Sequence, residues 1–260
     1  MNKTFDDNSA VFEGMTSISA VIRSVRSAST LQNFTYDRQI HTVLFDRAKL
    51  NSKSREYKFL TYASEDIGFE LKVCGADEID RFASGNTHGG IIALCSDRTM
   101  PQLMVENITE IGFYALIEGI EDPYNFGYSL RSLYAAGVDG IILTPRNWMS
   151  AAGTVAKASA GTSELLPMYC TESACVGELF HAKNYKIAAA GIRDSVSFAK
   201  ADLKKPLLLI VGGEKRGISR SLLECVDTTV RIDYAREFKG SLPTASAVSV
   251  LAFEVLRQNQ

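Results

Sequence analysis

Short apolar runs recur along the second half of the chain, and each is separated from the next by a segment with helical periodicity. This rhythm constrains the fold more than any other feature of the sequence, because strands that alternate with crossover helices form a parallel sheet covered on both faces. The runs occupy residues 114–117, 140–144, 166–170, 186–190, 207–211 and 228–232. The sequence therefore predicts an α/β fold with a parallel sheet in this half.

The residues before Pro101 show a less regular alternation. Helices are predicted over 17–28, 52–63 and 77–82, and strands over 41–45, 69–73 and 90–95. We therefore expect a small α/β domain over residues 1–100, of which the first ten or so are disordered. Polar residues around Pro101 predict a linker over 101–112, followed by a second domain over 113–260.

Composition excludes several classes of protein. The net charge of −2 argues against non-specific coating of nucleic acid, although a local basic patch stays possible. The five cysteines show no CxxC spacing and the three histidines no metal-ligand spacing, so neither a disulfide framework nor a metal site is expected. No apolar run is long enough for a membrane span and the start of the chain lacks the form of a signal peptide, so we expect a cytoplasmic protein.

The first candidate motif follows the first strand of the second half. Asn125, Gly127 and Arg131 stand at the start of a predicted helix, where Asn125 can act as a cap and a helical turn can bring Arg131 back toward the strand ends. An arginine placed there can clamp a phosphate with two parallel hydrogen bonds. Taken alone, the motif is better explained by a capped helix with a solvated arginine.

The second candidate motif is the glycine-rich turn 212–217, which follows the strand at 207–211. Gly212 and Gly213 allow close approach of a ligand to the backbone, and Glu214 adds a carboxylate. The turn lacks the endings of a phosphate-binding P-loop and of a dinucleotide fingerprint, so ATP and NAD are disfavoured. Basic residues crowd this turn and the loop before the last helix: Lys215, Arg216, Arg220, Arg231, Arg236 and Lys239.

The third candidate motif is the turn from Gly240 through Ser241 and Leu242 to Pro243, which leads into a long apolar helix at the C-terminus. The first N–H groups of such a helix point at whatever fills the neighbouring cleft. A capped helix with proline in its first turn is the plain alternative.

The order and spacing of these three motifs resemble the SpoU/TrmH branch of the SPOUT RNA methyltransferases. The resemblance runs from Phe113 to the C-terminus and includes the segment from Gly153 to Gly161. The front unit, which ends in residues 86–94, is similar to the small ribosomal-protein-like RNA-recognition domain that many members carry.

This resemblance implies a fold and an activity. It implies a deep trefoil knot in the C-terminal domain, a homodimer, and methylation of a ribose 2′-hydroxyl in structured RNA with S-adenosylmethionine as the methyl donor. Ribosomal RNA is the expected substrate, and transfer RNA is the alternative. No metal is required, because the sulfonium methyl is already electrophilic and the protein mainly has to align the reacting oxygen.

The resemblance also implies roles for individual residues. Arg131 is expected to contact the target nucleotide and to help activate its 2′-hydroxyl, while Asn125 and Glu214 shape the catalytic site. The residues expected around the cofactor are Gly212, Gly213, Glu214, Ile232, Ser241 and Leu242. Those expected to contact RNA are Lys215, Arg216 and Lys157.

One departure from the family pattern stands in the third motif. Where the family commonly has Ser-Leu-Asn-x-Ser, this chain has Pro243 in place of the asparagine and Ala245 in place of the second serine. Proline removes a backbone donor and alanine removes a hydroxyl, which Thr244 or Ser246 would have to replace. A catalytically weak protein that binds RNA or cofactor therefore stays open as an alternative. A nucleotide-dependent enzyme on an ordinary doubly wound sheet lacks its phosphate-loop signature.

Overall fold

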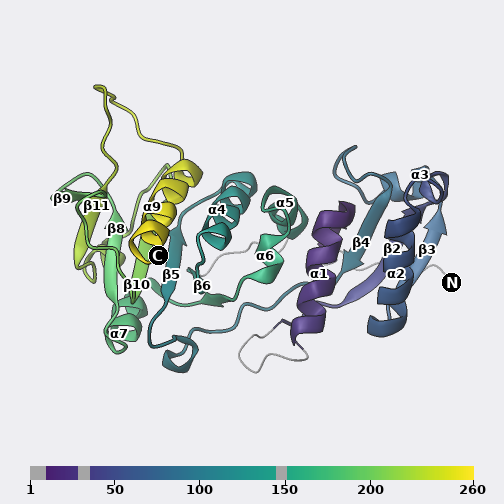
Figure 1. Cartoon of the computed structure of the whole chain (residues 1–260), viewed down its shortest axis with the longest axis horizontal. Helices are drawn as coiled ribbons and strands as arrows, with labels where there is room; N and C mark the ends of the chain where they lie inside the picture. The colour runs from purple at the N-terminus through teal and green to yellow at the C-terminus, as the bar shows by residue number, and fades with distance from the viewer. Residues whose placement is uncertain (1–9, 29–35, 145–150) are drawn as a thin grey trace. The chain divides into compact units, whose positions relative to one another are not determined.

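The computed structural model describes residues 10–28, 36–144 and 151–260, which form two compact units (Figure 1). The first unit comprises the described residues of 1–99 and 147–165, and the second those of 100–146 and 166–260. The disorder expected for the first ten residues falls almost entirely outside the described part of the chain.

A four-stranded sheet forms the centre of the first unit. Its strands are β1 (Ala10–Glu13), β2 (Ile40–Asp46), β3 (Glu70–Cys74) and β4 (Ile91–Cys95). They lie in the order β1-β4-β2-β3, with β2 and β3 parallel and the other pairs antiparallel. The last three strands confirm the predictions from apolar patterning. Strand β1 was not predicted, because its four residues directly follow a polar segment expected to be disordered.

Two long helices pack on this sheet, α1 (Gly14–Ala28) and α2 (Ser54–Ile67), and a short helix α3 (Ala76–Asp80) follows β3. Helix α1 buries Ile18 and Ile22, and α2 buries Leu60, in one hydrophobic core with residues of β2 and β4. Apolar residues at helical spacing thus confirm both predicted helices.

Helices α5 (Ala152–Ala158) and α6 (Thr162–Leu165) belong to the first unit, although they follow the second strand of the predicted C-terminal domain. A Cβ atom at Gly153 would lie 1.8 Å from the carbonyl oxygen of Val11, so only glycine permits this approach of α5 to β1. The structure therefore differs from an uninterrupted second domain over 113–260, because contacts with residues far away in sequence hold this segment.

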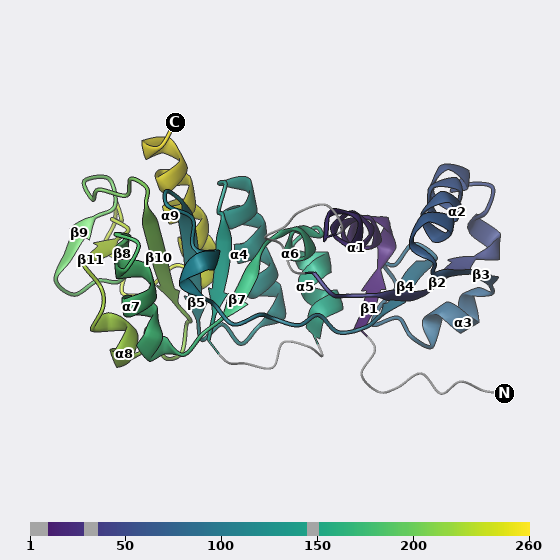
Figure 2. The ribbon, with the colours of Figure 1, turned by 90° about the horizontal axis from the view of Figure 1, so that it is seen from below.

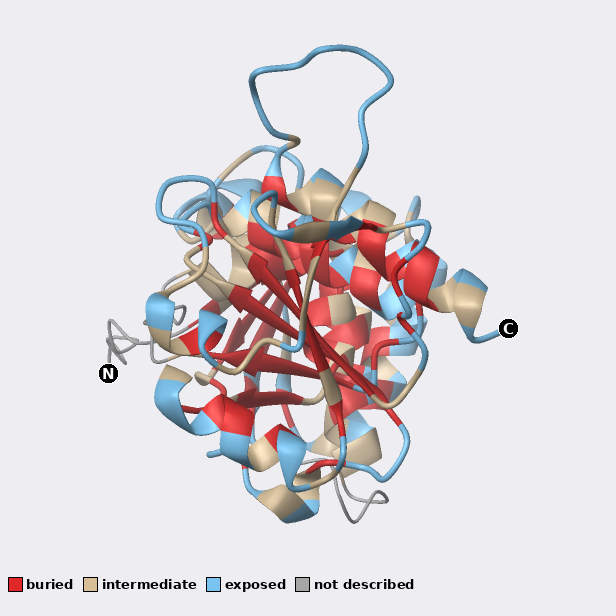
Figure 3. Ribbon diagram, turned by 90° about the vertical axis from the view of Figure 1, so that its left-hand side faces the viewer, coloured by how far each residue is buried: buried red, intermediate tan, exposed pale blue. Residues whose placement is uncertain are grey.

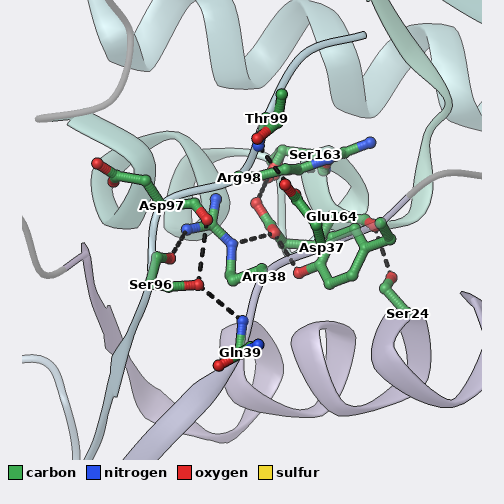
Figure 4. A network of polar contacts seen from close by, with 12 residues as sticks. Ser24, Asp37, Arg38, Gln39, Ser96, Asp97, Arg98, Thr99, Ser163 and Glu164 are labelled. Atoms are coloured by element: carbon green, nitrogen blue, oxygen red, sulfur yellow. Dashed lines mark hydrogen bonds and ion pairs between the residues drawn. The ribbon is translucent and has the colours of Figure 1, made fainter.

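A buried polar network joins α6 to the loops of the first unit (Figure 4). Glu164 accepts hydrogen bonds from the Tyr36 hydroxyl at 2.5 Å and from Arg38 Nε at 2.9 Å. Arg98 donates to the carbonyl oxygen of Ser163 at 3.0 Å, and its guanidinium lies over the Tyr36 ring. Burial, together with the negative charge of Glu164, raises the pKa of Tyr36 well above its ordinary value.

The second unit contains a seven-stranded parallel sheet. Its strands are β5 (Phe113–Glu118), β6 (Gly140–Leu143), β7 (Met168–Cys170), β8 (Lys186–Ala190), β9 (Ser195–Ser197), β10 (Leu207–Gly212) and β11 (Thr228–Arg231). The strand order is β7-β6-β5-β10-β8-β11-β9. All neighbours are parallel. The predicted parallel α/β sheet is thus confirmed, while the three-residue strand β9 is polar and was not predicted.

Helices cover both faces of this sheet (Figure 2). On one face α4 (Pro123–Ala135) packs against the C-terminal helix α9 (Thr244–Gln258). On the other face α7 (Val176–His181) and α8 (Arg220–Leu223) contribute Val176, Phe180 and Leu222 to a core with alternate residues of the central strands.

The segment 101–112, expected to be a linker, packs into the second unit instead. Leu103 and Ile108 are buried in the same core as Phe180, and Gln102 forms a bridge to Cys170 at the edge of β7. Two apolar side chains within ten positions of the start of β5 are sufficient to fix the segment, because burying each one is favourable.

Candidate functional site

A cavity of about 630 Å³ lies at the carboxyl edge of the seven-stranded sheet. Strands β8, β10 and β11 are parallel, so their last residues, Ala190, Gly212 and Arg231, meet at this edge and line the cavity. Strand β5 lies between β10 and β6, and β6 is the strand that follows it in the chain. The strand order therefore reverses direction between β5 and β10. Ligands of open α/β sheets bind at such a reversal of strand order.

The six residues predicted to surround a cofactor all line this cavity. They are Gly212, Gly213, Glu214, Ile232, Ser241 and Leu242. The wall also contains apolar residues that the sequence did not single out, among them Ile192, Ile218 and Leu251. These three come from segments that only the strand order and the packing of α9 bring together.

Glycines permit the tight turn after β10. Gly217 adopts a positive φ of 64°, and its N–H donates to the carbonyl oxygen of Gly213 at 3.0 Å. A Cβ atom at Gly213 would lie 2.2 Å from the carbonyl oxygen of Gly119, and one at Gly212 would lie 2.5 Å from Gly217. The turn is thus closed on itself and packed against the end of β5, where any side chain at these positions would clash.

A carboxylate also ties this turn to the end of β5. Glu118 accepts a hydrogen bond from the Ser219 N–H at 2.6 Å, and its carbonyl oxygen accepts from the Gly213 N–H at 2.6 Å. The position of the turn relative to β5 is therefore fixed from both of its ends.

Asn125 and Glu214 lie together beside the main cavity, in a smaller one of about 150 Å³. Asn125 Nδ2 donates to Glu214 Oε1 at 3.3 Å. The expected cap of α4 is a different residue, since Asp122 accepts from the N–H groups of Tyr124 and Asn125. This leaves the side-chain amide of Asn125 available to contact the glycine-rich turn.

Thr244 takes the position nearest to this pair in the third motif. Its N–H donates to Glu214 Oε1 at 3.4 Å, its hydroxyl donates to the Gly212 carbonyl oxygen at 3.4 Å, and it lines both cavities. Thr244 is 4% exposed, whereas Ser246 is exposed and lines neither cavity. Pro243 caps α9 through its carbonyl oxygen, which accepts from Ser246 and Ala247. Of the two hydroxyls considered from the sequence, that of Thr244 is the one at the site.

Arg131 lines neither cavity. It lies exposed on α4, and its guanidinium makes no hydrogen bond or ion pair with any residue in the described part of the chain. It shares one face of α4 with Tyr124 and Tyr128, within about 60° of arc. The expected return of Arg131 to the strand ends is therefore not seen in a single chain.

The three residues predicted to contact RNA are divided between the two units. Lys215 belongs to the glycine-rich turn, lines the smaller cavity and forms an ion pair with Glu121 at 2.6 Å. Arg216 is exposed on the same turn. Lys157 belongs to α5 in the first unit and pairs with Glu13 at 3.0 Å.

The strand order and the glycine-rich turn define an α/β protein with a cavity of small-ligand size at the carboxyl edge of its sheet. Comparison with known protein families identifies the family. The sequence model of the SpoU rRNA methylase family matches residues 112–253, which is more than half of the chain. The chain therefore belongs to the SpoU rRNA methylase family, as the ordered motifs predicted.

Curated relatives extend the likeness beyond this region. The 23S rRNA (guanosine-2′-O-)-methyltransferase RlmB of Shewanella oneidensis is 29% identical over 201 residues, which are 75% of this chain and 80% of that protein. The enzyme of the same name from Pseudomonas aeruginosa is 30% identical over 200 residues, which are 74% of this chain and 79% of that protein.

Solved structures share the fold. The AdoMet-bound rRNA methyltransferase from Sinorhizobium meliloti has a TM-score of 0.77 at 20% identity and covers 96% of this chain and 87% of its own. The SpoU methyltransferase AviRb from Streptomyces viridochromogenes, in complex with AdoMet, also has a TM-score of 0.77, at 19% identity, and covers 96% of this chain and 90% of its own.

No helix in the described ranges is both long and apolar enough to cross a membrane.

Proposed function

We propose that this protein transfers a methyl group from S-adenosylmethionine to a ribose 2′-hydroxyl of ribosomal RNA. The observation that carries the proposal is the meeting of three motifs from distant parts of a SpoU-family chain at the carboxyl edge of the sheet. The second and third motifs line the main cavity, and Asn125 of the first lines the smaller cavity beside it. The names of the RlmB relatives support ribosomal RNA as the substrate and the ribose as the acceptor.

The residues of the cavity fit the proposed methyl donor. A volume of about 630 Å³ lies within the range of small-molecule sites. Ile218, Leu242 and Leu251 offer apolar contact to an adenosine, while the backbone groups around Gly212 and Ser241 offer hydrogen bonds. When bound, the donor supplies an electrophilic methyl group, so the protein has to orient the acceptor oxygen and assist the loss of its proton.

Glu214 is the proposed positioning residue. Its carboxylate holds both the Asn125 amide and the first N–H of α9, so it fixes the walls of the two cavities against each other. Thr244 supplies the hydroxyl that the family pattern places one residue later, which supports an active enzyme despite Pro243 and Ala245.

We infer that the protein works as a homodimer through the exposed face of α4 and α9. Tyr124 is 50% exposed and Tyr128 48%, and Phe253 of α9 is 49% exposed. Large aromatic side chains grouped on a surface are typical of protein interfaces. Arg131 stands among them, so a second copy seated on this face would make Arg131 part of a site formed by both copies. The trefoil knot and the cytoplasmic location stay predictions.

Incubation of the purified protein with methyl-labelled S-adenosylmethionine and total RNA tests the proposed function. We expect label in ribosomal RNA, and we expect calorimetry to show binding of the cofactor without RNA. Label confined to transfer RNA would contradict ribosomal RNA as the substrate. A protein that binds no S-adenosylmethionine would contradict the proposed reaction.

A further inference from the structure

The loop over residues 233–241 is exposed along its whole length and connects β11 to α9 above the carboxyl edge of the sheet (Figure 3). Four of its side chains nevertheless line the cavity at that edge. They are Tyr234, Arg236, Phe238 and Lys239. The loop thus combines two aromatic rings with two cations at the mouth of the proposed active site.

The two rings form a defined surface. Tyr234 and Phe238 pack edge to face, with 5.4 Å between the ring centroids. The Leu242 N–H donates to the Tyr234 hydroxyl at 3.2 Å and so closes the loop. A Cβ atom at Gly240 would lie 2.7 Å from the Phe238 ring, so the glycine lets that ring fold back across the chain.

Both rings stay open to a ligand despite this packing. Tyr234 is 40% exposed and Phe238 is 55% exposed. A half-exposed aromatic pair at a cavity mouth presents a π-face to any flat group that enters.

The charges that the loop presents to the cavity favour an anionic ligand, since Arg236 and Lys239 line it and Glu237, which lies between them in the sequence, does not. Asp233, at its start, is engaged by the Ser197 hydroxyl and by Arg231, which hold its pKa below the ordinary value. Arg236 and Lys239 make no ion pair with any residue in the described part of the chain. Two available cations beside two rings match the phosphates and the base of an unpaired nucleotide.

We propose that Tyr234 and Phe238 stack on an unpaired base of the RNA substrate while Arg236 and Lys239 contact its flanking phosphates. This inference rests on the proposed function and identifies the part of the substrate that the site recognises: a single-stranded nucleotide beside or at the methylated ribose. Stacking on a ring tolerates any base, so this contact positions the RNA rather than reading its sequence.

The test measures binding of the full-length protein to two labelled probes by fluorescence anisotropy. One is an unstructured oligoribonucleotide of about 12 nucleotides, and the other is an abasic strand of the same length and charge. Phe238→Leu is expected to weaken binding of the first probe by about 10-fold or more and to leave the abasic probe unchanged. Phe238→Trp, which keeps a stacking surface, is expected to retain parental affinity.

The cations give a second readout. Arg236→Gln and Lys239→Gln are each expected to weaken binding of both probes. Each is also expected to lower the steepness of log affinity against log salt concentration by about 0.7. Phe238→Leu is expected to leave that slope unchanged. Lys204→Gln, on a surface that lines neither cavity, removes the same charge and is the matched control.

Three results would overturn the inference. If Phe238→Leu lost the same binding affinity for both probes, the ring would only shape the loop. Loss of S-adenosylmethionine affinity in calorimetry, with RNA binding intact, would assign the rings to the cofactor's adenine. A shift from dimer to monomer, with RNA binding intact, would assign them to a second copy of the chain.

The inference and the proposed function fail separately. A parent protein that binds RNA through these rings but transfers no methyl group contradicts only the proposed function. A parent protein that methylates RNA, with all loop variants binding both probes as tightly as it does, contradicts only the inference about the loop.

Discussion

Asn125 Nδ2 donates a hydrogen bond to Glu214 Oε1 at 3.3 Å across 89 positions of the chain. The Thr244 N–H donates to the same oxygen at 3.4 Å. One carboxylate oxygen therefore joins the start of α4, the turn after β10 and the start of α9. These are the three segments whose order identified the family from the sequence, and their meeting point explains why all three motifs occur together.

Removal of the Glu214 carboxylate should misalign the site without unfolding the protein. We expect Glu214→Ala to lower kcat/KM for methyl transfer by about 10- to 100-fold, since a small displacement of positioning groups costs that much. Glu214→Gln keeps an acceptor oxygen, so its kcat/KM should lie between those of Glu214→Ala and the parent. Glu224→Ala, on the exposed surface of the same unit, is the control; parental rates in both Glu214 variants would rule out this role.

Arg131 should matter for turnover and not for the fold. We expect Arg131→Ala to lower kcat by about 100-fold or more, the loss expected for a group that assists proton removal. Because Arg131 lines neither cavity in a single chain, the affinity for S-adenosylmethionine should stay unchanged. Arg220→Ala, which removes another exposed arginine, should be neutral. Normal turnover by Arg131→Ala would show that the residue has no part in the reaction.

Two hydroxyl variants test how the chain compensates for Ala245. Thr244→Val keeps the shape of the side chain but removes the donor to the part-buried Gly212 carbonyl oxygen, at a cost of about 1 kcal/mol. We expect slower methyl transfer and a lower melting temperature. Ser246→Ala should change stability by less than about 0.5 kcal/mol. The opposite ranking of the two variants in the transfer assay would assign the role to Ser246.

The buried network around Glu164 should dominate the stability of the first unit. Glu164→Gln leaves the Arg38 guanidinium buried without its counter-charge, and removal of one partner of a buried pair costs about 3–5 kcal/mol. Denaturant unfolding, followed by hydrogen exchange of the β2 amides, measures the loss. Glu65→Gln, exposed on α2, should lie within about 0.5 kcal/mol of the parent. Equal stability of the two variants would contradict the importance of the network.

Glu13 should make the first unit sensitive to acid. Burial alone would raise the pKa of Glu13, but its hydrogen bonds from Lys157 and from the Ser84 N–H, with the charge of Lys157, lower it below the ordinary value. A carboxyl with a depressed folded pKa stabilises the protein above its unfolded pKa, and this contribution is lost as the pH falls through the folded pKa. Glu13→Gln should flatten the fall in melting temperature below about pH 4.5. A parallel fall in both proteins would show that Glu13 contributes nothing.

The sequence predicted those parts of the fold that depend on local pattern. Apolar runs located β5, β8 and β10, and the order of the glycine-rich turns brought Gly212 and Leu242 to one cavity. Other features depend on contacts that no local pattern encodes. Glu164 contacts Tyr36 across 128 positions, and Gly153 packs on Val11, so the attachment of α5 and α6 to the first unit was not predictable.

The site itself shows the same division. Asn125 looks like a helix cap in the sequence because it stands at the start of α4, yet Asp122 takes that role and leaves the amide for Glu214. The alternation of residues in the loop 233–241 gives no sign that Tyr234 and Phe238 pack together. Only the fold of the loop, closed by the hydrogen bond from Leu242, brings these rings to the cavity.

The position of the transferred methyl group tests the proposed function most directly. Unmodified ribosomal RNA is incubated with the protein and labelled S-adenosylmethionine, digested to nucleosides and separated by mass spectrometry. We expect label in a single 2′-O-methylated nucleoside, and none when Gly213→Val, which clashes with Gly119, replaces the parent. Label on a base, or no label in any nucleoside, would contradict it.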